Sequence, residues 1–141
     1  MKIVNDVYGI RWYDDEGRLH NPDGPAYITS QGTRKYYIHG QLSRAGGPAV
    51  EYVGGVTEWY YKDVAHRIGG PAVESPHGSF SYIEDGLRHR LDGPACSFNG
   101  HERYYIRGVR YTEEDFKRAS KPRVRVRFVG DDMVICSRGS Q

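Results

Sequence analysis

The tripeptide Gly-Pro-Ala recurs along this chain at one fixed interval. It begins at Gly24, Gly47, Gly70 and Gly93, and each occurrence lies 23 residues after the one before. A fixed period of this length predicts a tandem repeat in which each unit is one supersecondary element that stacks on its neighbours. Because the turn signals inside each unit leave no room for a helix of ordinary length, the repeat predicts β-structure.

Other positions of the unit keep the same register. An aromatic residue stands at the same place in five successive units: Tyr13, Tyr36, Trp59, Tyr82 and Tyr105. A second column is glycine with one exception: Gly17, Gly40, Asp63 and Gly86. A third column is histidine with one exception, His20, Ser43, His66 and His89, and the residues that follow it are Asn21, Arg44, Arg67 and Arg90. Each unit therefore runs from an aromatic strand through a turn and a His-Arg pair to Gly-Pro-Ala and a second strand.

Within each unit the residue types favour a β-hairpin. The stretch 57–61, Thr-Glu-Trp-Tyr-Tyr, is β-branched and aromatic and lies between a Gly-Gly pair and Asp63. Pro71 stands at the first residue of the second strand, a position that proline tolerates, and Asp-Gly-Pro at 92–94 is a strong turn signal. Residues 1–111 are therefore predicted to form a mostly β, single-layer antiparallel meander or solenoid of about four and a half units and about ten strands.

The repeat ends before residues 112–141, which are predicted to form a cap. Residues 112–119 favour one short helix, because Thr112 is a suitable N-cap, acids crowd the first turn and bases stand in the last. Residues 123–128 alternate between arginine and apolar residues, and a Gly-Asp-Asp turn leads from them into 133–136. We therefore expect a C-terminal helix followed by a basic β-hairpin.

The repeated unit resembles the MORN repeat, whose unit has the same length and reads approximately Tyr-x-Gly-x-Trp-x-x-Gly-x-x-His-Gly-x-Gly. Residues 59–70, Trp-Tyr-Tyr-Lys-Asp-Val-Ala-His-Arg-Ile-Gly-Gly, follow this pattern in register. The chain departs from it in placing Arg67 where the family has glycine after histidine, and in the Pro-Ala that follows Gly70. The resemblance covers about residues 9–111.

The resemblance implies a module for protein interaction or membrane association. The variant with His-Arg-x-x-Gly-Pro-Ala is similar to units of uncharacterised phage and giant-virus proteins. This likeness implies a phage protein that inhibits a host-defence protein by occluding its working surface.

Charge limits the class of partner. The net charge is +2, but residues 121–141 hold five Lys or Arg against two Asp or Glu, a net of +3, whereas residues 1–120 hold 15 against 16, a net of −1. So small a bias gives little support to nucleic acid, which selects a strongly basic stripe.

Two further features of the sequence concern its setting. No apolar run approaches the ~20 residues that span a bilayer, and the first residues lack the apolar core of a signal peptide. Cys96 and Cys136 have no spacing typical of a metal site or a disulfide framework, which favours a cytoplasmic location.

The histidine column invites a metal hypothesis that its spacing argues against. Each unit contributes two strands, so equivalent residues of neighbouring units lie roughly 9–10 Å apart at ~4.8 Å per strand. Zinc needs its ligand nitrogens ~2 Å away, so His66 and His89 cannot share one ion. We expect no metal and no cofactor. Each histidine then either fixes its turn by hydrogen bonds or belongs to a ladder of His-Arg pairs that faces a ligand.

Two interpretations are also open for the arginines. Arg44, Arg67 and Arg90 either pair with nearby acids and stack on aromatic rings within the array, or present guanidinium groups to an acidic or phosphorylated partner. Arg123, Arg125 and Arg127 of the terminal hairpin either protect a strand edge from aggregation or bind phosphate, nucleic acid or anionic lipid.

The aromatic column is either the packed core or a binding face. Side chains alternate between the faces of a strand, so Tyr37 and Tyr60 point away from Tyr36 and Trp59. Tyr, Trp and Arg are enriched at interface hot spots. The candidate binding residues are Tyr37, Trp59, Tyr60, Tyr82, Tyr105, His66, Arg67, His89, Arg90, Arg44, Arg123, Arg125 and Arg127.

No motif in the sequence favours catalysis. The chain lacks a Gly-x-Ser-x-Gly elbow, a phosphate-binding loop and a Cys-x-x-Cys pair. We therefore expect a non-enzymatic module that binds a protein partner. A binder of phosphorylated ligand, nucleic acid or anionic lipid is the alternative, and self-association of the β-array edge to edge is a third possibility.

Overall fold

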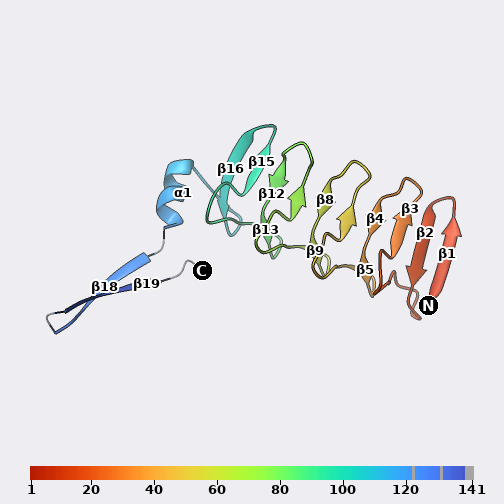
Figure 1. Ribbon diagram of the computed structural model, residues 1–141, viewed down its shortest axis with the longest axis horizontal. Helices are drawn as coiled ribbons and strands as arrows, with labels where there is room; N and C mark the ends of the chain where they lie inside the picture. Colours follow the sequence, from red (N-terminus) through yellow and green to blue (C-terminus); the bar gives the residue numbers. More distant parts are fainter. Residues whose placement is uncertain (122, 131, 139–141) are drawn as a thin grey trace.

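The computed structural model describes residues 1–121, 123–130 and 132–138, and it describes the strands at 123–129 and 132–138 by their backbone alone. Residues 1–111 form an elongated antiparallel array, whose units follow one another along the long axis (Figure 1). The predicted fold class, a mostly β antiparallel meander with one short helix near its C-terminal end, is confirmed.

The main sheet contains eleven strands in the order β1-β2-β3-β4-β7-β8-β11-β12-β15-β16-β17. Their bounds are β1 (Lys2–Asp6), β2 (Gly9–Tyr13), β3 (Tyr27–Thr29), β4 (Arg34–Lys35), β7 (Val50–Glu51), β8 (Thr57–Glu58), β11 (Val73–Glu74), β12 (Phe80–Ser81), β15 (Cys96–Phe98), β16 (His101–Ile106) and β17 (Val109–Tyr111). Each strand pairs with its neighbours in the antiparallel sense, so each unit contacts only the units beside it.

Three small hairpins continue the strands of the main sheet along one side of the array. They are β5 (Tyr37–Ile38) with β6 (Gln41–Leu42), β9 (Tyr60–Tyr61) with β10 (Val64–Ala65), and β13 (Ile83–Glu84) with β14 (Leu87–Arg88). In Figure 1 they lie below the main sheet, where labels β5, β9 and β13 stand. The single aromatic residue between β8 and β9, Trp59, therefore lies where the chain passes from the sheet to the hairpin.

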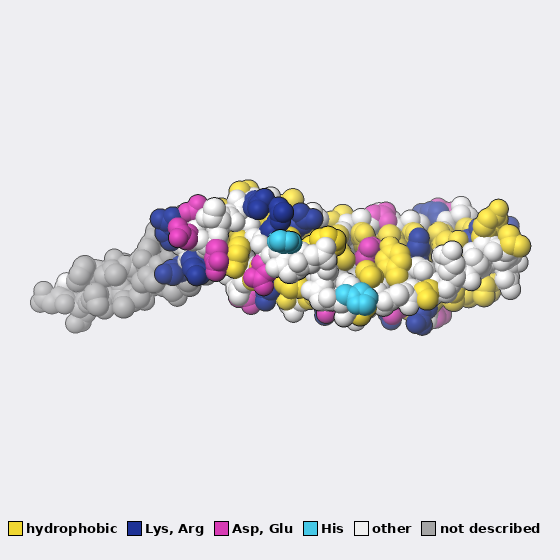
Figure 2. Space-filling view, turned by 90° about the horizontal axis from the view of Figure 1, so that it is seen from above, with side chains coloured by type: hydrophobic (Ala, Val, Ile, Leu, Met, Phe, Trp, Pro, Cys, Tyr) yellow, Lys and Arg dark blue, Asp and Glu magenta, His cyan; other side chains and the backbone are white. Residues whose placement is uncertain are grey.

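The alanine of each Gly-Pro-Ala forms the centre of the core. Ala26, Ala49, Ala72 and Ala95 have no exposed surface. The backbone N–H of the aromatic residue of the same unit donates to each alanine carbonyl, as from Tyr36 to Ala49 and from Trp59 to Ala72, both at 2.7 Å. No side chain of large volume is fully buried among the described residues, and much apolar surface stays visible from above (Figure 2). The array is thus held by small residues packed against backbone.

The predicted aromatic column is wrong by one residue at each end. Trp12, not Tyr13, donates its N–H to Ala26. At the other end Tyr104 takes the place expected for Tyr105, because the turn Asn99-Gly100 joins β15 to β16 with only two residues. Two residues with positive φ, 50° and 78°, make the tight turn that such hairpins prefer. Tyr13, Tyr36, Trp59, Tyr82, Tyr104 and Tyr105 are all half-buried, so the rings form neither a closed core nor an open face.

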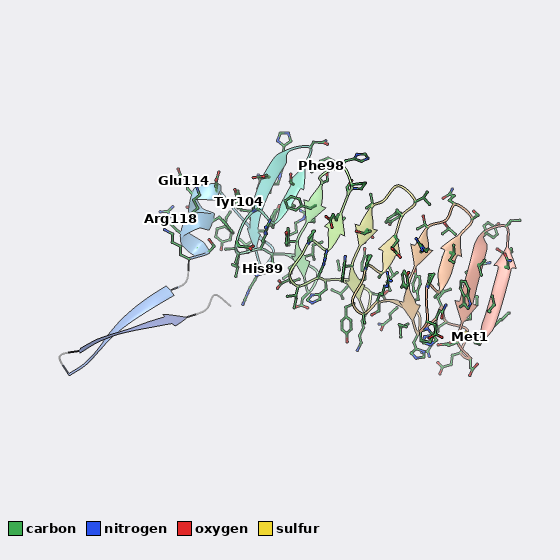
Figure 3. All side chains as sticks on the ribbon, viewed as in Figure 1. Met1, His89, Phe98, Tyr104, Glu114 and Arg118 are labelled. Atoms are coloured by element: carbon green, nitrogen blue, oxygen red, sulfur yellow. The ribbon has the colours of Figure 1, made fainter. Side chains whose placement is uncertain are left out.

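A short helix covers the C-terminal end of the array, as the sequence predicts. Helix α1 (Glu113–Ala119) begins after Thr112, whose hydroxyl accepts a hydrogen bond from the N–H of Asp115 at 3.2 Å. Phe116 is the buried residue of the helix, and its ring lies 4.7 Å from the ring of Tyr104, centroid to centroid. Figure 3 shows Tyr104 facing the helix from β16. Phe116 thus covers the last ring of the aromatic column, Tyr104.

The expected basic hairpin is also present as backbone. Strands β18 (Arg123–Val129) and β19 (Asp132–Arg138) pair with each other over their whole length. No helix among the described residues has both the length and the hydropathy to cross a membrane.

Candidate binding hollow between the second and third units

The arginines stack on the aromatic rings of their own units. The guanidinium carbons of Arg44, Arg67 and Arg90 lie 3.9, 4.0 and 4.0 Å from the ring centroids of Tyr36, Trp59 and Tyr82. Their Nη1 groups donate to the carbonyls of Pro48, Pro71 and Pro94 at 3.0–3.1 Å. The contacts therefore follow the first interpretation, in which the arginines are used within the array.

This stacking explains the glycine of Gly-Pro-Ala. A Cβ atom at Gly70 would lie 2.7 Å from Cζ of Arg67, and the same atom at Gly47 would lie 2.9 Å from Cζ of Arg44. Neither glycine has a positive φ, so the turn itself does not demand it. In the first unit Asn21 replaces arginine, and its Nδ2 donates to the carbonyl of Pro25 at 3.1 Å. A side chain at Gly47 or Gly70 would therefore displace the guanidinium, whereas a Cβ atom at Gly24 would meet only Nδ2 of Asn21, at 3.7 Å.

The histidines join each unit to the next. Nδ1 of His20, His66 and His89 accepts the backbone N–H of His39, Asp85 and Arg107, at 3.0, 2.9 and 2.9 Å. These three donors have positive φ between 46° and 50°. The expectation that each histidine fixes its own turn is wrong in one respect, because the turn that it holds belongs to the following unit.

At the junction between the second and third units the side-chain acceptor comes from the later unit instead of the earlier one. Ser43 takes the place of histidine and Asp63 takes the place of glycine. Oδ1 of Asp63 accepts the N–H of Leu42 at 2.7 Å. At this junction a carboxylate of the later unit thus accepts a backbone N–H of the earlier unit, whereas at the others a histidine of the earlier unit accepts a backbone N–H of the later one.

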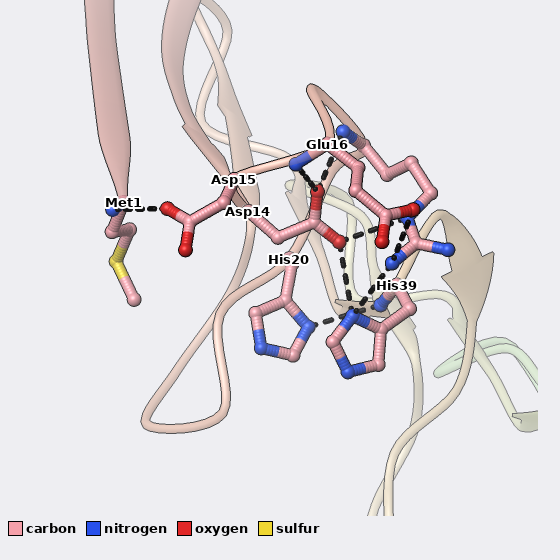
Figure 4. A network of polar contacts seen from close by, with 7 residues as sticks. Met1, Asp14, Asp15, Glu16, His20 and His39 are labelled. Carbon is pink, nitrogen blue, oxygen red and sulfur yellow. Dashed lines mark hydrogen bonds and ion pairs between the residues drawn. The ribbon is translucent and has the colours of Figure 1, made fainter.

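The first junction adds an ionic network (Figure 4). The carboxylate of Asp14 contacts Nδ1 of His39 at 2.9 Å and Nε of Arg18 at 2.9 Å, and the rings of His20 and His39 stack at 4.1 Å. The hydrogen bond from His39 and those from Arg18 hold the pKa of Asp14 well below its usual range. These contacts stabilise the junction between the first and second units.

A hollow of about 380 Å³ opens between the second and third units. Equivalent loops of the two units form its walls, and the strand between them forms its floor. Its lining residues are Arg44, Ala45, Gly46, Trp59, Tyr60, Tyr61, His66, Arg67 and Ile68. We refer to this feature, with these nine residues, as the hollow.

A small residue makes room for the hollow. Ala45 stands at the position that Pro22, Ile68 and Leu91 occupy in the other units, and Gly46 follows it. Both Ala45 and Gly46 are exposed. Ile68 on the opposite wall is 76 % exposed, and Tyr61 on the floor is 57 % exposed. The hollow is therefore an open, largely apolar surface with an aromatic floor.

The hollow carries positive charge and no acid. Its lining includes two arginines and one histidine but neither aspartate nor glutamate. Arg44 is partly neutralised by Glu51 at 3.3 Å, whereas Nε and Nη2 of Arg67 have no hydrogen-bond partner among the described residues. The electrostatics therefore favour an acidic group beside an apolar one.

Tyr60 stays neutral in this environment. Its hydroxyl donates to Glu58 at 3.1 Å, and burial together with this carboxylate raises the pKa of Tyr60 to about 12.

The structure brings five of the predicted binding residues together in the hollow: Arg44, Trp59, Tyr60, His66 and Arg67. Tyr82, His89 and Arg90 repeat the same stack one unit further along, where Ile68 takes the place of Ala45 and Leu91 takes the place of Ile68. Tyr37 and Tyr105 are half-buried outside the hollow. The side chains of Arg123, Arg125 and Arg127 lie outside what the structure describes. Ala45, Gly46, Tyr61 and Ile68 were not predicted from the sequence. Ala45 could have been noticed, because it is smaller than the residues at the same place in the other units, Pro22, Ile68 and Leu91.

Among the described residues no group of three or more His, Cys, Asp or Glu is placed to hold a metal ion. Comparison with known proteins finds no match: no family model fits the chain, and no curated protein and no solved structure is similar to it.

Proposed function

We propose that this chain is a non-catalytic protein-binding module, and that the hollow receives an apolar or aromatic side chain of the partner with an acidic residue beside it. The observation that carries this proposal is the combination of exposed Tyr61 and Ile68 with the free guanidinium edge of Arg67. Exposed apolar surface gains when water leaves it, and the neighbouring guanidinium can exchange its water for a charge-assisted hydrogen bond to a carboxylate of the partner.

The size of the hollow suits such a ligand. Recognition pockets range from ~300 to ~1,000 Å³, and 380 Å³ lies at the lower end, where one or two side chains fit. Trp59, Tyr60 and Arg67 are also of the three residue types most enriched at interface hot spots. A side chain stacked on Tyr61 would place its neighbouring carboxylate near Nε and Nη2 of Arg67.

The stack beneath the hollow supports the proposal by keeping the floor rigid. Arg67 is held on Trp59 at 4.0 Å and tied to the carbonyl of Pro71 at 3.0 Å. A binding surface that is ordered before the partner arrives loses less conformational entropy on binding.

A displayed peptide library selected on the immobilised protein tests the proposal. We expect enrichment of peptides that pair an aromatic or aliphatic residue with Asp or Glu. Ala45→Leu should weaken the binding of the enriched peptides at least tenfold, because leucine fills the hollow. Ala119→Leu, at an exposed alanine of α1, is the matched control and should bind as the unaltered chain does. Absence of enrichment, or equal binding by both variants, would contradict the proposal.

A phosphorylated or otherwise anionic ligand is the second candidate, supported by Arg44 and Arg67 in the same hollow. The internal contacts of both guanidinium groups count against it, because a phosphate would compete with the Pro48 and Pro71 carbonyls. Such a ligand predicts affinity that falls steeply with salt. Replacing Arg123, Arg125 and Arg127 with Glu tests the terminal hairpin separately. Inhibition of a host-defence protein stays a prediction from the resemblance.

A further inference from the structure

Strand β1 is an open edge of the main sheet. It pairs with β2 on one side and with no strand of the described residues on the other. The opposite end of the array is covered by α1, which packs on β16 and β17. An uncovered edge strand offers unpaired N–H and C=O groups to another chain.

The hydrogen bonds of β2 show which groups of β1 face outwards. Trp12 directs its N–H away from β1, to the carbonyl of Ala26. Since alternate residues of an antiparallel strand bond to opposite neighbours, Arg11 and Tyr13 bond to β1, where Val4 and Lys2 stand opposite them. Ile3 and Asn5 therefore direct their backbone groups to the open edge.

The sequence of β1 is complementary to itself in the antiparallel sense. When Val4 faces Val4 of a second copy, Ile3 faces Asn5, and these two residues hold the outward groups that form a hydrogen-bonded pair. In the same register Lys2 faces Asp6 at both ends of the strand. Opposite charges placed directly across a strand pair stabilise it, and so do two β-branched residues.

The apolar surface at this end matches the same register. Met1, Val7 and Tyr8 are 65, 81 and 67 % exposed, and Figure 2 shows apolar side chains gathered at the N-terminal end of the array. Antiparallel pairing brings Met1 of one copy opposite Val7 of the other. A second hollow, of about 480 Å³, is lined by Met1, Lys2 and Val4 of this end and by Tyr13 and the turn that follows it.

We propose that a second copy of this chain pairs with β1 about a two-fold axis at Val4, so that the two main sheets become one continuous antiparallel sheet. The contact is confined to one short strand and its two ends. An interface well below ~1,200 Å² forms a weak complex, so the monomer and the dimer are in concentration-dependent equilibrium. The proposal is independent of the hollow between the second and third units, which lies on other strands.

Analytical ultracentrifugation over a concentration series tests the pairing. Asn5→Pro removes an outward N–H and leaves the bonds to β2 in place, so it should abolish the dimer without loss of β-structure in the circular dichroism spectrum. Lys2→Glu should weaken the dimer through repulsion of Asp6, whereas Arg34→Glu, an equal change of charge within the sheet, should not. A chain that stays monomeric throughout, or a dimer that Asn5→Pro leaves intact, would overturn the proposal.

Cross-linking tests the register. In a Cys136→Ser background, Val4→Cys places two thiols opposite each other across the axis, within the ~3.5–4.5 Å between Cβ atoms that a disulfide requires. Ile3→Cys places them on residues that do not face each other. Oxidation should give a covalent dimer with Val4→Cys and none with Ile3→Cys, and the reverse result would exclude a two-fold axis at Val4.

Discussion

The junction between the second and third units and the junction between the third and fourth use different residues for the same purpose. In the later junction Nδ1 of His66 accepts the N–H of Asp85 from the following unit at 2.9 Å. In the earlier one Oδ1 of Asp63 accepts the N–H of Leu42 from the preceding unit at 2.7 Å. In both, one acceptor side chain satisfies one backbone donor at the boundary.

The comparison separates the parts of the repeat that build the array from the part that is free to vary. Alanine and the arginine stack recur in the second, third and fourth units with nearly equal distances. The wall position varies in size between Ala45, Ile68 and Leu91, and the hollow lies beside the smallest of the three. The repeat can therefore vary at this position while the alanine and the arginine stack stay the same.

The largest expected effect comes from enlarging the alanine that the scaffold needs. Ala72→Leu puts a larger side chain where no surface is exposed, and overpacking of this kind costs about 1–3 kcal/mol. Ala45→Leu, the same substitution on the wall of the hollow, should change the free energy of unfolding by less than about 0.5 kcal/mol. Urea denaturation of the two variants measures the difference. Equal destabilisation would show that the hollow wall is part of the core.

Removal of one guanidinium should cost less than the enlarged alanine. Arg90→Met keeps the volume but loses the stack on Tyr82 and the hydrogen bond to the carbonyl of Pro94, which together contribute about 1–2 kcal/mol. Arg34→Met, on an exposed strand position, is the control. Thermal denaturation compares them, and a Tm of Arg90→Met equal to that of the control would show that the stack stabilises nothing.

The two kinds of junction should lose similar amounts when their acceptors are removed. His66→Ala and Asp63→Gly each leave one backbone donor without its partner, at a cost of about 1 kcal/mol, and glycine is used at position 63 because the φ there is 66°. Hydrogen exchange should quicken at the amide of Asp85 in the first variant and at the amide of Leu42 in the second. Exchange that quickens at both amides in both variants would indicate that the junctions open together.

Acid should weaken the first junction through Asp14. The pKa of Asp14 is lowered in the folded chain by its hydrogen bonds to His39 and Arg18, so its contribution to stability is present at neutral pH and is lost as the pH falls through the folded-state pKa. Asp14→Asn should therefore lower Tm at neutral pH and converge with the unaltered chain in acid. Parallel curves of Tm against pH would contradict this assignment.

The β-meander was predictable from the sequence because each 23-residue period corresponds to one structural unit of the stack. The exact interval between Gly24, Gly47, Gly70 and Gly93 predicted the stacked units, but it did not identify the four alanines that follow as the buried core. The ends of the aromatic column were predicted wrongly because they depend on turn length. Asn99-Gly100 is a two-residue turn, and it moves Tyr104 into the place expected for Tyr105.

The candidate site was predicted only in part. Trp59, Tyr60 and Arg67 were recognisable as candidates, but a guanidinium stacked on a ring recurs in the next unit, so these residue types did not single out this place. The sequence difference beside the hollow is the small residue Ala45, in a column that otherwise holds Pro22, Ile68 and Leu91, and a small residue indicates space without indicating which ligand would fill it. The roles of the arginines could not be predicted for another reason: the same residue at the same position of the unit can stack on a ring or face a ligand.

The smallest expected effect comes from converting one junction into the other. Asp63→Gly alone leaves the N–H of Leu42 without its acceptor and should cost about 1 kcal/mol, although glycine suits the φ of 66° at this position. Adding Ser43→His supplies an Nδ1 acceptor for the N–H of Lys62, which has the same positive φ, 48°, as the donors at the other junctions. The double variant should therefore return to within about 0.5 kcal/mol of the unaltered chain, with a coupling energy that a double-mutant cycle measures. Additive losses would mean that the two exceptions do not compensate each other, and that the second junction is held by contacts of its own.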